Sequence, residues 1–330
     1  MEMKNSFKKI GLLTSGGDAP GMNAAIRAVV RTCVFHNISP IGISKGYDGL
    51  INSDMQIMNA RSVKGIINKG GTILKTARSN EFKTKNGREK AYNNLKKNEI
   101  DGLVVIGGDG TFTGGLIFSS EFNFPVIGVP ATIDNDIFGT SHTIGFDSAT
   151  NTVMTAIDKI RDTASSHNRL FFIEVMGRDA GHIALNTGVA GGAEEILIPE
   201  ENLGLDRLIQ SLKRSQKTGK SSSIVVVAEG DNTGENVFQL KQYVEKHLSE
   251  YEARVAVLGH MQRGGSPTCF DRVLASRLGV NAVESMINGK ICSMVGLQNN
   301  KVVLTPFKKA TKGITKINSE LLRVSDIMSI

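Results

Sequence analysis

Short apolar runs alternate with amphipathic stretches along nearly all 330 residues, and this alternation restricts the fold more than any other feature. The apolar runs are residues 8–15, 40–46, 102–108, 124–129, 169–177, 194–199, 222–230 and 253–260. The amphipathic stretches are residues 23–35, 149–163, 205–216, 236–248 and 271–287. Such continuous runs are typical of strands covered on both faces, as in parallel sheets. The pattern and the chain length together predict two doubly wound, mostly parallel α/β domains.

The amino-acid composition indicates which kinds of ligand and which cellular compartment suit this chain. The chain carries 39 Lys and Arg against 32 Asp and Glu, a net charge of +7 that suits small anionic ligands as well as nucleic acid. Only 5% of the residues are aromatic, which argues against a base-stacking platform. Cys33, Cys269 and Cys292 form no CxxC motif and indicate a reducing compartment. The apolar N-terminal stretch breaks at Ser15-Gly16, and no run approaches the ~18 apolar residues of a membrane helix. We expect a cytoplasmic protein with no nucleic-acid or membrane partner.

Two glycine-rich segments follow predicted strands, at the edge where such sheets bind ligands. LLTSGGDAPGMN (residues 12–23) leads into a helix, an arrangement that favours a phosphate or nucleotide. VVIGGDGTFTGG (residues 104–115) is not a Walker A loop, and Thr113 stands where a dinucleotide fingerprint requires its third glycine. Asp109 lies within this second segment, where a bare carboxylate would repel phosphates unless Mg²⁺ bridged them. A kinase is therefore favoured over a dehydrogenase.

The segment PATIDND (residues 130–136) carries two aspartates two positions apart. If the preceding strand continues, Asp134 and Asp136 project to the same side and can surround a proton, a metal or a substrate hydroxyl. A solvated turn is the simpler alternative. A kinase needs such a base and also cations for the transferring phosphoryl group. Candidate cations at strand ends are Arg78, Arg169, Arg178, Arg254, His260 and Arg263, although any single Arg is more often a surface ion-pair partner. Glu229, at another strand end, suits sugar hydroxyls.

Taken in order, TSGGDAPGMNAAIR, GGDGT, TIDND, SSHNR, VMGRDAGHIAL and GHMQRGG resemble the bacterial-type 6-phosphofructokinase family. The resemblance runs from about Lys8 to about Asn300. GGDGT also occurs in NAD kinases and lipid kinases, whereas TIDND, MGR and the GHxQRGG loop are specific.

The resemblance implies a role for each matching position. Asp134 would take the proton from the sugar 1-hydroxyl, assisted by Thr132 and Asp136, and Arg178 would stabilise charge on the transferred phosphoryl group. ATP would be bound by Gly17, Arg78, Ser79, Gly108, Asp109, Gly110 and Thr111, with Asp109 on Mg²⁺. The substrate fructose 6-phosphate would contact Thr132, Asp134, Met176, Gly177, Arg178, Glu229, His260 and Arg263, together with Arg169 and Arg254 from a neighbouring subunit.

The resemblance also implies the organisation of the molecule. An ATP-binding domain would comprise residues 1–145 and 262–312, and a sugar-phosphate-binding domain residues 146–261 and 313–330, with the active site in the cleft between them. The assembly would be a homotetramer. An effector site for ADP or phosphoenolpyruvate would use Arg27, Arg31, Arg61, Arg161, Gly192, Glu194 and Lys220.

One departure from the family concerns regulation. Thr218, Ser221 and Ser222 stand where regulated relatives usually carry Lys or His. Because a hydrogen bond to a charged group contributes roughly 1.5–3 kcal/mol, their loss should weaken effector binding. We expect a retained pocket with blunted or altered regulation, and strong, ordinary effects of ADP and phosphoenolpyruvate on sugar-phosphate affinity would contradict this.

Two positions indicate the phosphoryl donor. ATP-dependent members carry Gly after GGD and a small residue before the Thr of TIDND, whereas pyrophosphate-dependent members carry Asp and Lys. Gly110 and Ala131 therefore favour ATP. Pyrophosphate dependence and a tagatose 6-phosphate substrate remain alternatives. An NAD- or lipid-kinase reading leaves TIDND and GHMQRGG unexplained, and an oxidoreductase lacks its third glycine and its ribose-binding acid. A regulatory homologue should have lost Asp109, Asp134 or Arg178, and all three are present.

Overall fold

The chain divides by its internal contacts into two units. The computed structural model describes residues 7–165, 169–201, 204–217 and 223–329. Unit 1 comprises residues 1–132, 137–148 and 263–315, and unit 2 comprises residues 133–136, 149–262 and 316–330. The assignment of ATP to one unit and sugar phosphate to the other stays a prediction.

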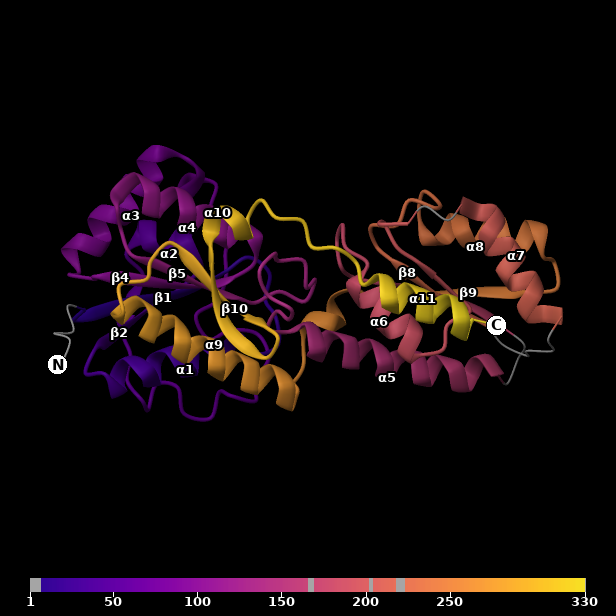
Figure 1. The fold of residues 1–330 in the computed structure, drawn as a ribbon, viewed down its shortest axis with the longest axis horizontal. Coiled ribbons are helices and arrows are strands. Elements are labelled where there is room, and N and C mark those ends of the chain that lie inside the picture. The colour runs from indigo at the N-terminus through magenta and orange to yellow at the C-terminus, as the bar shows by residue number, and fades with distance from the viewer. Residues whose placement is uncertain (1–6, 166–168, 202–203, 218–222, 330) are drawn as a thin grey trace. The chain divides into compact units, whose positions relative to one another are not determined.

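The described residues of unit 1 form a seven-stranded sheet in the order β11-β10-β5-β4-β1-β2-β3 (Figure 1). The strands are β1 (Lys9–Ser15), β2 (Ser39–Ile43), β3 (Met55–Ile57), β4 (Gly102–Gly107), β5 (Val126–Pro130), β10 (Ser293–Gln298) and β11 (Lys301–Pro306). All pair in parallel except β3 and β11, the two edge strands. Helices cover both faces. One face carries α1 (Met22–Phe35) and α9 (Cys269–Ile287), and the other α2 (Gly46–Asn52), α3 (Lys85–Lys97), α4 (Asp109–Phe122) and α10 (Phe307–Ala310).

The described residues of unit 2 form a four-stranded parallel sheet in the order β7-β8-β6-β9. Its strands are β6 (Arg169–Val175), β7 (Glu195–Leu197), β8 (Ser223–Ala228) and β9 (Glu252–Val257). One face is covered by α5 (Phe146–Ser165), α6 (His182–Ala190) and α11 (Ser319–Met328), and the other by α7 (Gly204–Lys217) and α8 (Val237–His247) (Figure 1). Two short 3₁₀ turns, η1 (Glu81–Lys83) and η2 (Gly259–Arg263), complete the described elements.

The predicted fold class is confirmed, and each of the eight expected strands and five expected helices is present. Strands β3, β10 and β11 and several helices are present in addition to those that the sequence pattern predicts, and α4 is the most instructive of them. Its sequence contains three glycines and lies partly within the glycine-rich segment 104–115, for which the sequence pattern predicts no helix. Gly114 and Gly115 are there for packing, because a Cβ on Gly114 would lie 2.9 Å from the Tyr47 ring. Tertiary contact therefore outweighs the poor helix propensity of glycine.

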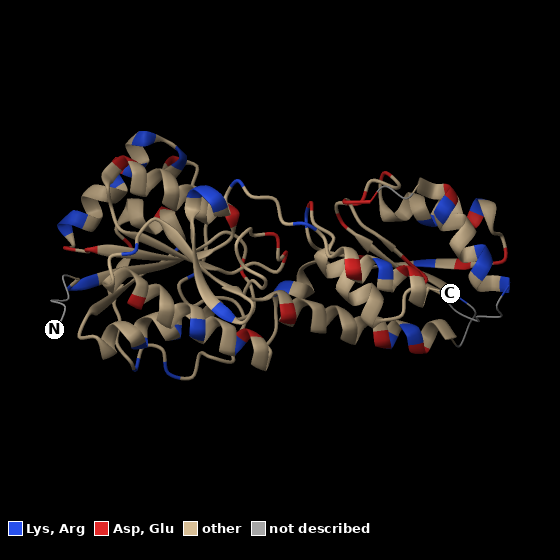
Figure 2. Ribbon diagram, in the orientation of Figure 1, with Lys and Arg blue, Asp and Glu red and all other residues tan. Residues whose placement is uncertain are grey.

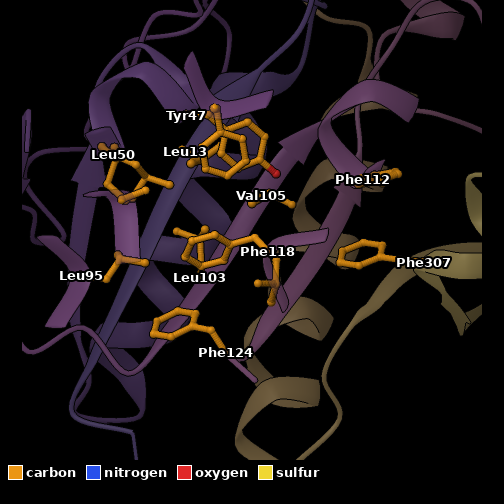
Figure 3. Packing of buried hydrophobic residues seen from close by; sticks show 14 of the residues in the cluster. Leu13, Tyr47, Leu50, Leu95, Leu103, Val105, Phe112, Phe118, Phe124 and Phe307 are labelled. Carbon is orange, nitrogen blue, oxygen red and sulfur yellow. The ribbon is translucent and has the colours of Figure 1, made fainter. Parts of the chain in front are cut away.

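An aromatic core between the sheet and helices α2, α3, α4 and α10 fixes the first turn of α4 (Figure 3). Tyr47 stacks on Phe82 with ring centroids 4.0 Å apart, and its buried hydroxyl donates to the Thr111 carbonyl at 2.6 Å. Burial raises the pKa of Tyr47, so the phenol stays a neutral donor. The Thr111 hydroxyl donates in turn to the carbonyl of Ser15, at the end of β1, at 3.1 Å. The core thus ties the start of α4 to the first glycine segment.

A bidentate ion pair joins α3 to α4. The Arg88 side chain is nearly buried, and its Nε and Nη2 each donate to a Glu121 carboxylate oxygen at 2.6 Å. Its Nη1 donates to the carbonyls of Phe82 and Lys83. This hydrogen bonding lowers the pKa of Glu121 and raises that of Arg88.

Glu121→Gln should lower the free energy of unfolding by about 1.5–3 kcal/mol at neutral pH, since a charge-assisted bond is lost beside a buried guanidinium. The pKa of Glu121 is depressed below its ordinary 4.5, so its contribution is present above that value and disappears as pH falls through the folded pKa. Urea unfolding of both proteins across this range measures the effect. Glu89→Gln, which removes an exposed i,i+4 pair, should change stability by less than about 0.5 kcal/mol. A wild-type advantage that persisted in acid would contradict the assignment.

Candidate active site

Asp134 and Arg178 are the two predicted catalytic residues that the structure brings together. Both belong to unit 2, and Arg178 Nε lies 3.8 Å from Asp134 Oδ2. The Asp134 side chain is 4% exposed, whereas that of Arg178 is 60% exposed. A buried carboxylate thus lies beside a cation that reaches solvent, which is the pairing required to deprotonate a hydroxyl and stabilise charge on an incoming phosphoryl group.

The geometric premise for the aspartate pair is wrong. Strand β5 ends at Pro130, so Asp134 and Asp136 follow the strand instead of continuing it. Asn135, between them, has φ 51, a left-handed conformation that interrupts strand alternation. Asp134 is buried and Asp136 is partly exposed. Because this turn is not a strand, the i, i+2 spacing does not by itself place both carboxylates on one side.

Arg178 lies in an irregular loop that follows β6, and side-chain hydrogen bonds fix the backbone of this loop. Gly177 has φ 146 and Arg178 has φ 53, the latter a conformation that costs a non-glycine residue about 1–3 kcal/mol. Glu229 Oε1 accepts from the N–H groups of Gly177 and Arg178 at 3.2 and 2.7 Å. A Cβ on Gly230 would lie 2.0 Å from the Arg178 carbonyl, so only glycine permits this approach. Glu229 therefore orders the loop, a role that its expected contact with sugar did not include.

A second acid lies near Glu229. Burial, and then the charge of Glu229, raise the pKa of Glu174, the penultimate residue of β6. The carboxyl ends of β6 and β8 thus carry two acids, of which Glu229 accepts the loop N–H groups.

Gln262 is a residue of the site that the sequence does not predict. Its side chain is fully buried, and its Oε1 accepts from the N–H of Met176 at 3.2 Å. The residue lies in the GHMQRGG motif between two predicted phosphate ligands, His260 and Arg263. No periodicity or spacing identifies it, because its partner is a backbone group 86 residues earlier.

The two glycine segments of unit 1 lie at the ends of adjacent parallel strands. Ser15 pairs with Gly107, and Gly107 pairs with Pro130, so the ends of β1, β4 and β5 adjoin. Asp109 is the first residue of α4, with Gly108 as N-cap. A Cβ on Gly110 would meet no atom within 4 Å, so packing does not require a glycine there. The helix N-terminus and this open space suit an anionic ligand.

Arg263 contacts the first glycine segment. Its Nη1 donates to the Asp18 carbonyl at 3.2 Å, and a Cβ on Gly17 would lie 2.7 Å from the same nitrogen. A Cβ at position 17 would therefore displace this guanidinium group from its present place. Arg78 is exposed, and the neighbouring Ser79 accepts from the N–H of Phe82. The chain before them is anchored at β1, because the Thr14 hydroxyl donates to the Lys75 carbonyl at 2.9 Å.

Arg169 and Arg254 lie together but away from Arg178. Both guanidinium groups bind the carboxylate of Glu252, whose pKa is lowered first by the hydrogen bond from Arg169. Arg169 begins β6 and Arg178 follows its end, so roughly 20 Å of strand separates their backbones. His260 is exposed in η2, beyond the carboxyl end of β9. Within one chain, the described residues do not bring Arg169 to the Asp134–Arg178 pair.

The expected effector residues fall in both units. Arg27 and Arg31 lie four apart on α1, and partial burial, followed by the charge of Arg31, lowers the pKa of Arg27. Arg61 is exposed. Arg161 donates to the carbonyls of Gly191 and Gly192, the latter at 3.0 Å, and buried Glu194 accepts from the N–H of Ile224. Lys220, Thr218, Ser221 and Ser222 lie outside the described residues.

The part of the chain that the structure describes contains no cluster of metal-ligating residues and no membrane-spanning helix. No three His, Cys, Asp or Glu side chains there could hold a metal ion. Mg²⁺ is often held by one or two carboxylates plus phosphates, so Asp109 at the α4 N-terminus fits that chemistry. None of the described helices is long and apolar enough to cross a membrane.

Comparisons with known proteins agree with the expected family. Residues 9–286 match the family described as Phosphofructokinase. ATP-dependent 6-phosphofructokinase 1 of Thermus thermophilus is 55% identical over 324 residues, covering 98% of this chain and 100% of that protein. ATP-dependent 6-phosphofructokinase of Bacillus pumilus is 54% identical, with the same coverage.

Solved structures share the fold. Phosphofructokinase from Saccharomyces cerevisiae aligns with a TM-score of 0.85 and 35% identity, covering 98% of this chain. This chain spans 48% of the yeast chain. Pyrophosphate-dependent phosphofructokinase from Nitrosospira multiformis aligns with a TM-score of 0.87 over 96% of this chain and 90% of that one, and at 20% identity it shows the fold alone. Because the family match spans most of the chain and relatives more than half identical cover nearly all of it, the chain belongs to the phosphofructokinase family.

Proposed function

We propose that the chain is a kinase that transfers the terminal phosphoryl group of ATP to the C1 hydroxyl of fructose 6-phosphate, forming fructose 1,6-bisphosphate in glycolysis. The observation that carries this proposal is the buried Asp134 carboxylate 3.8 Å from the exposed Arg178 guanidinium. The ATP-dependent 6-phosphofructokinases of Thermus thermophilus and Bacillus pumilus, at 55% and 54% identity, support it. The three cysteines of this chain are all free thiols, which fits a cytoplasmic enzyme.

In this proposal Asp134 takes the proton of the C1 hydroxyl while that oxygen attacks the phosphoryl group. Thr132 and Asp136 flank the base. Arg178 stabilises the charge on the transferred group, and its fixed loop means that little reorganisation is needed during the reaction. Glu229 has one oxygen committed to the loop, so Oε2 is the one that faces sugar. Met176 and Gly177 complete the substrate contacts, and His260 and Arg263 bind the 6-phosphate.

ATP is assigned to the loops at the ends of β1 and β4, through Gly17, Arg78, Ser79, Gly108, Asp109, Gly110 and Thr111. Phosphates at the N-terminus of α4 benefit from the helix dipole. Mg²⁺, held by Asp109 and the phosphates, would neutralise part of the charge that develops during transfer.

The sugar-phosphate site is proposed to need two chains of a homotetramer. Arg169 and Arg254 are remote from Arg178 in their own chain, so they can serve the same substrate only from a neighbouring subunit. The effector site is likewise proposed to persist around Arg27, Arg31, Arg61, Arg161, Gly192, Glu194 and Lys220, for ADP or phosphoenolpyruvate.

Asp134→Ser should lower turnover about 10²–10⁴-fold and leave binding of fructose 6-phosphate mostly intact, because it removes the general base. Steady-state kinetics and direct binding of the sugar phosphate measure the two effects separately. Asp179→Ser, which removes an exposed carboxylate next to Arg178, serves as the matched control and should retain turnover. Equal turnover in the wild type and Asp134→Ser would remove Asp134 from the mechanism.

Gly110→Asp should lower kcat/KM for ATP by roughly two to three orders of magnitude, because the introduced carboxylate would repel the ATP phosphates. The fold should survive, since a Cβ at this position meets nothing within 4 Å. Gly110→Ala is the control and should retain ATP use. Wild type and variants are assayed with ATP and with pyrophosphate in parallel. Pyrophosphate turnover by the wild type would overturn the donor assignment, and silence with both donors would indicate another sugar phosphate or a regulatory protein.

Arg254→Ser should raise the KM for fructose 6-phosphate, because a cation on the 6-phosphate is lost. Subunits carrying Arg254→Ser and Asp134→Ser, mixed and reassembled, should regain activity at about a quarter of their sites, where each chain supplies the residue that the other lacks. The measurement is turnover before and after reassembly, at a fructose 6-phosphate concentration far below the KM of Arg254→Ser. Absence of recovery in mixed oligomers would contradict the shared site.

A further inference from the structure

Three consecutive backbone N–H groups, those of Met176, Gly177 and Arg178, are all accepted by side chains. Glu229 Oε1 accepts the second and third, and Gln262 Oε1 accepts the first. Strand β6 ends at Val175, so these groups lie beyond its ladder. Buried or partly buried N–H groups require acceptors, and here two side chains provide them.

Both polar atoms of the Gln262 side-chain amide are hydrogen-bonded. While Oε1 accepts from Met176, Nε2 donates to the Gly259 carbonyl at 3.1 Å, and the side chain is fully buried. An amide is the neutral side chain that offers both an acceptor and a donor in this fork. The residue therefore links the start of the Arg178 loop to the first residue of η2, the turn that carries His260.

The loop needs such support because of its backbone. Arg178 has φ 53, and Gly177 before it has φ 146, so neither residue is held by regular secondary structure. Such conformations persist where surrounding contacts determine them. Met176 is where the chain leaves β6, and its N–H bond to Gln262 sets the position from which Gly177 and Arg178 follow.

We propose that Gln262 is a positioning residue for the phosphoryl-transfer reaction, acting through the backbone of Met176 to hold Arg178 in place and through Gly259 to hold the His260 turn with it. This role rests on the function proposed above for Arg178 and His260. Gln262 touches no reacting group. Its contribution is alignment, and small misplacements of a catalytic group can cost about 10²-fold in rate.

The experiment compares Gln262→Leu and Gln262→Glu with the wild type in the full-length protein. Gln262→Leu removes both hydrogen bonds at similar volume, so kcat should fall about 10²-fold while the KM for ATP changes less than about twofold. Asn94→Leu is the matched control. That amide of α3 donates to the carbonyls of Leu50 and Ile51 in unit 1, so its loss should lower the melting temperature and leave kcat unchanged.

Gln262→Glu provides a signature that a purely structural role does not give. When protonated, its carboxyl group offers one acceptor and one donor and so reproduces the amide, whereas the carboxylate cannot donate to Gly259. Burial and the nearby charge of Glu229 favour the neutral form of the introduced acid. Its kcat relative to wild type should therefore rise as pH falls, while the ratio for Gln262→Leu stays flat. Melting temperatures at each pH exclude simple unfolding as the cause.

The outcomes separate this role from the proposed function. Wild type without turnover would contradict the proposed function and, with it, this role. Active wild type with a Gln262→Leu kcat within about threefold of it would overturn the role of Gln262 alone, as would a flat and equally low ratio for Gln262→Glu. If Gln262→Leu does not fold, the pH profile of Gln262→Glu decides the question.

Discussion

Parallel strand pairing is the constraint on which the rest of this molecule depends. In a parallel sheet every strand points the same way, so the segments that follow the strands gather along one edge. In unit 1 the register of Ser15 with Gly107 and of Gly107 with Pro130 brings together the two glycine segments and the start of TIDND. In unit 2 the parallel neighbours β8, β6 and β9 do the same for Glu229, Arg178 and His260. Within each unit, loops that are remote in the sequence thus lie along one edge of the sheet.

This arrangement leaves backbone N–H and C=O groups without strand partners where the hydrogen-bonded ladders end. Backbone groups beyond a strand lose their regular partners, and this chain supplies side chains in their place. Glu229 and Gln262 take three successive N–H groups at the end of β6, and Gly230 allows the Arg178 carbonyl to approach. In unit 1, the Thr111 hydroxyl donates to the carbonyl of Ser15 at the end of β1, and the Tyr47 hydroxyl donates to the carbonyl of Thr111 in the first turn of α4. Glu229 and Gln262 thus bind backbone groups, and the Arg178 side chain beside Asp134 is mostly exposed to solvent.

In unit 2, charged side chains lie at both ends of the strands. Glu174 and Glu229 lie at the carboxyl ends of β6 and β8, and near the opposite ends of β6 and β9 Arg169 and Arg254 share Glu252. Residues of both charges occur throughout this unit (Figure 2). The seven residues of β6 keep the backbone of Arg169 about 20 Å from that of Arg178, too far for one phosphate ester to reach both cations. Strand length is thus the physical reason for proposing that neighbouring subunits complete one another's substrate sites.

The sequence by itself determined the fold class and eight of the strands, because continuous apolar runs are local properties, and its contiguous motifs indicated the family. The family resemblance assigned Asp134 and Arg178 to one reaction without predicting their contact. The assigned roles of the site residues stay predictions. Only the tertiary structure decided that α4 is a helix despite its glycines, that Asn135 turns the chain between the two aspartates, and that Gln262 binds Met176. Each of these depends on packing or hydrogen bonding between residues remote in the chain, or on one backbone angle, and neither leaves a period or a spacing in the sequence.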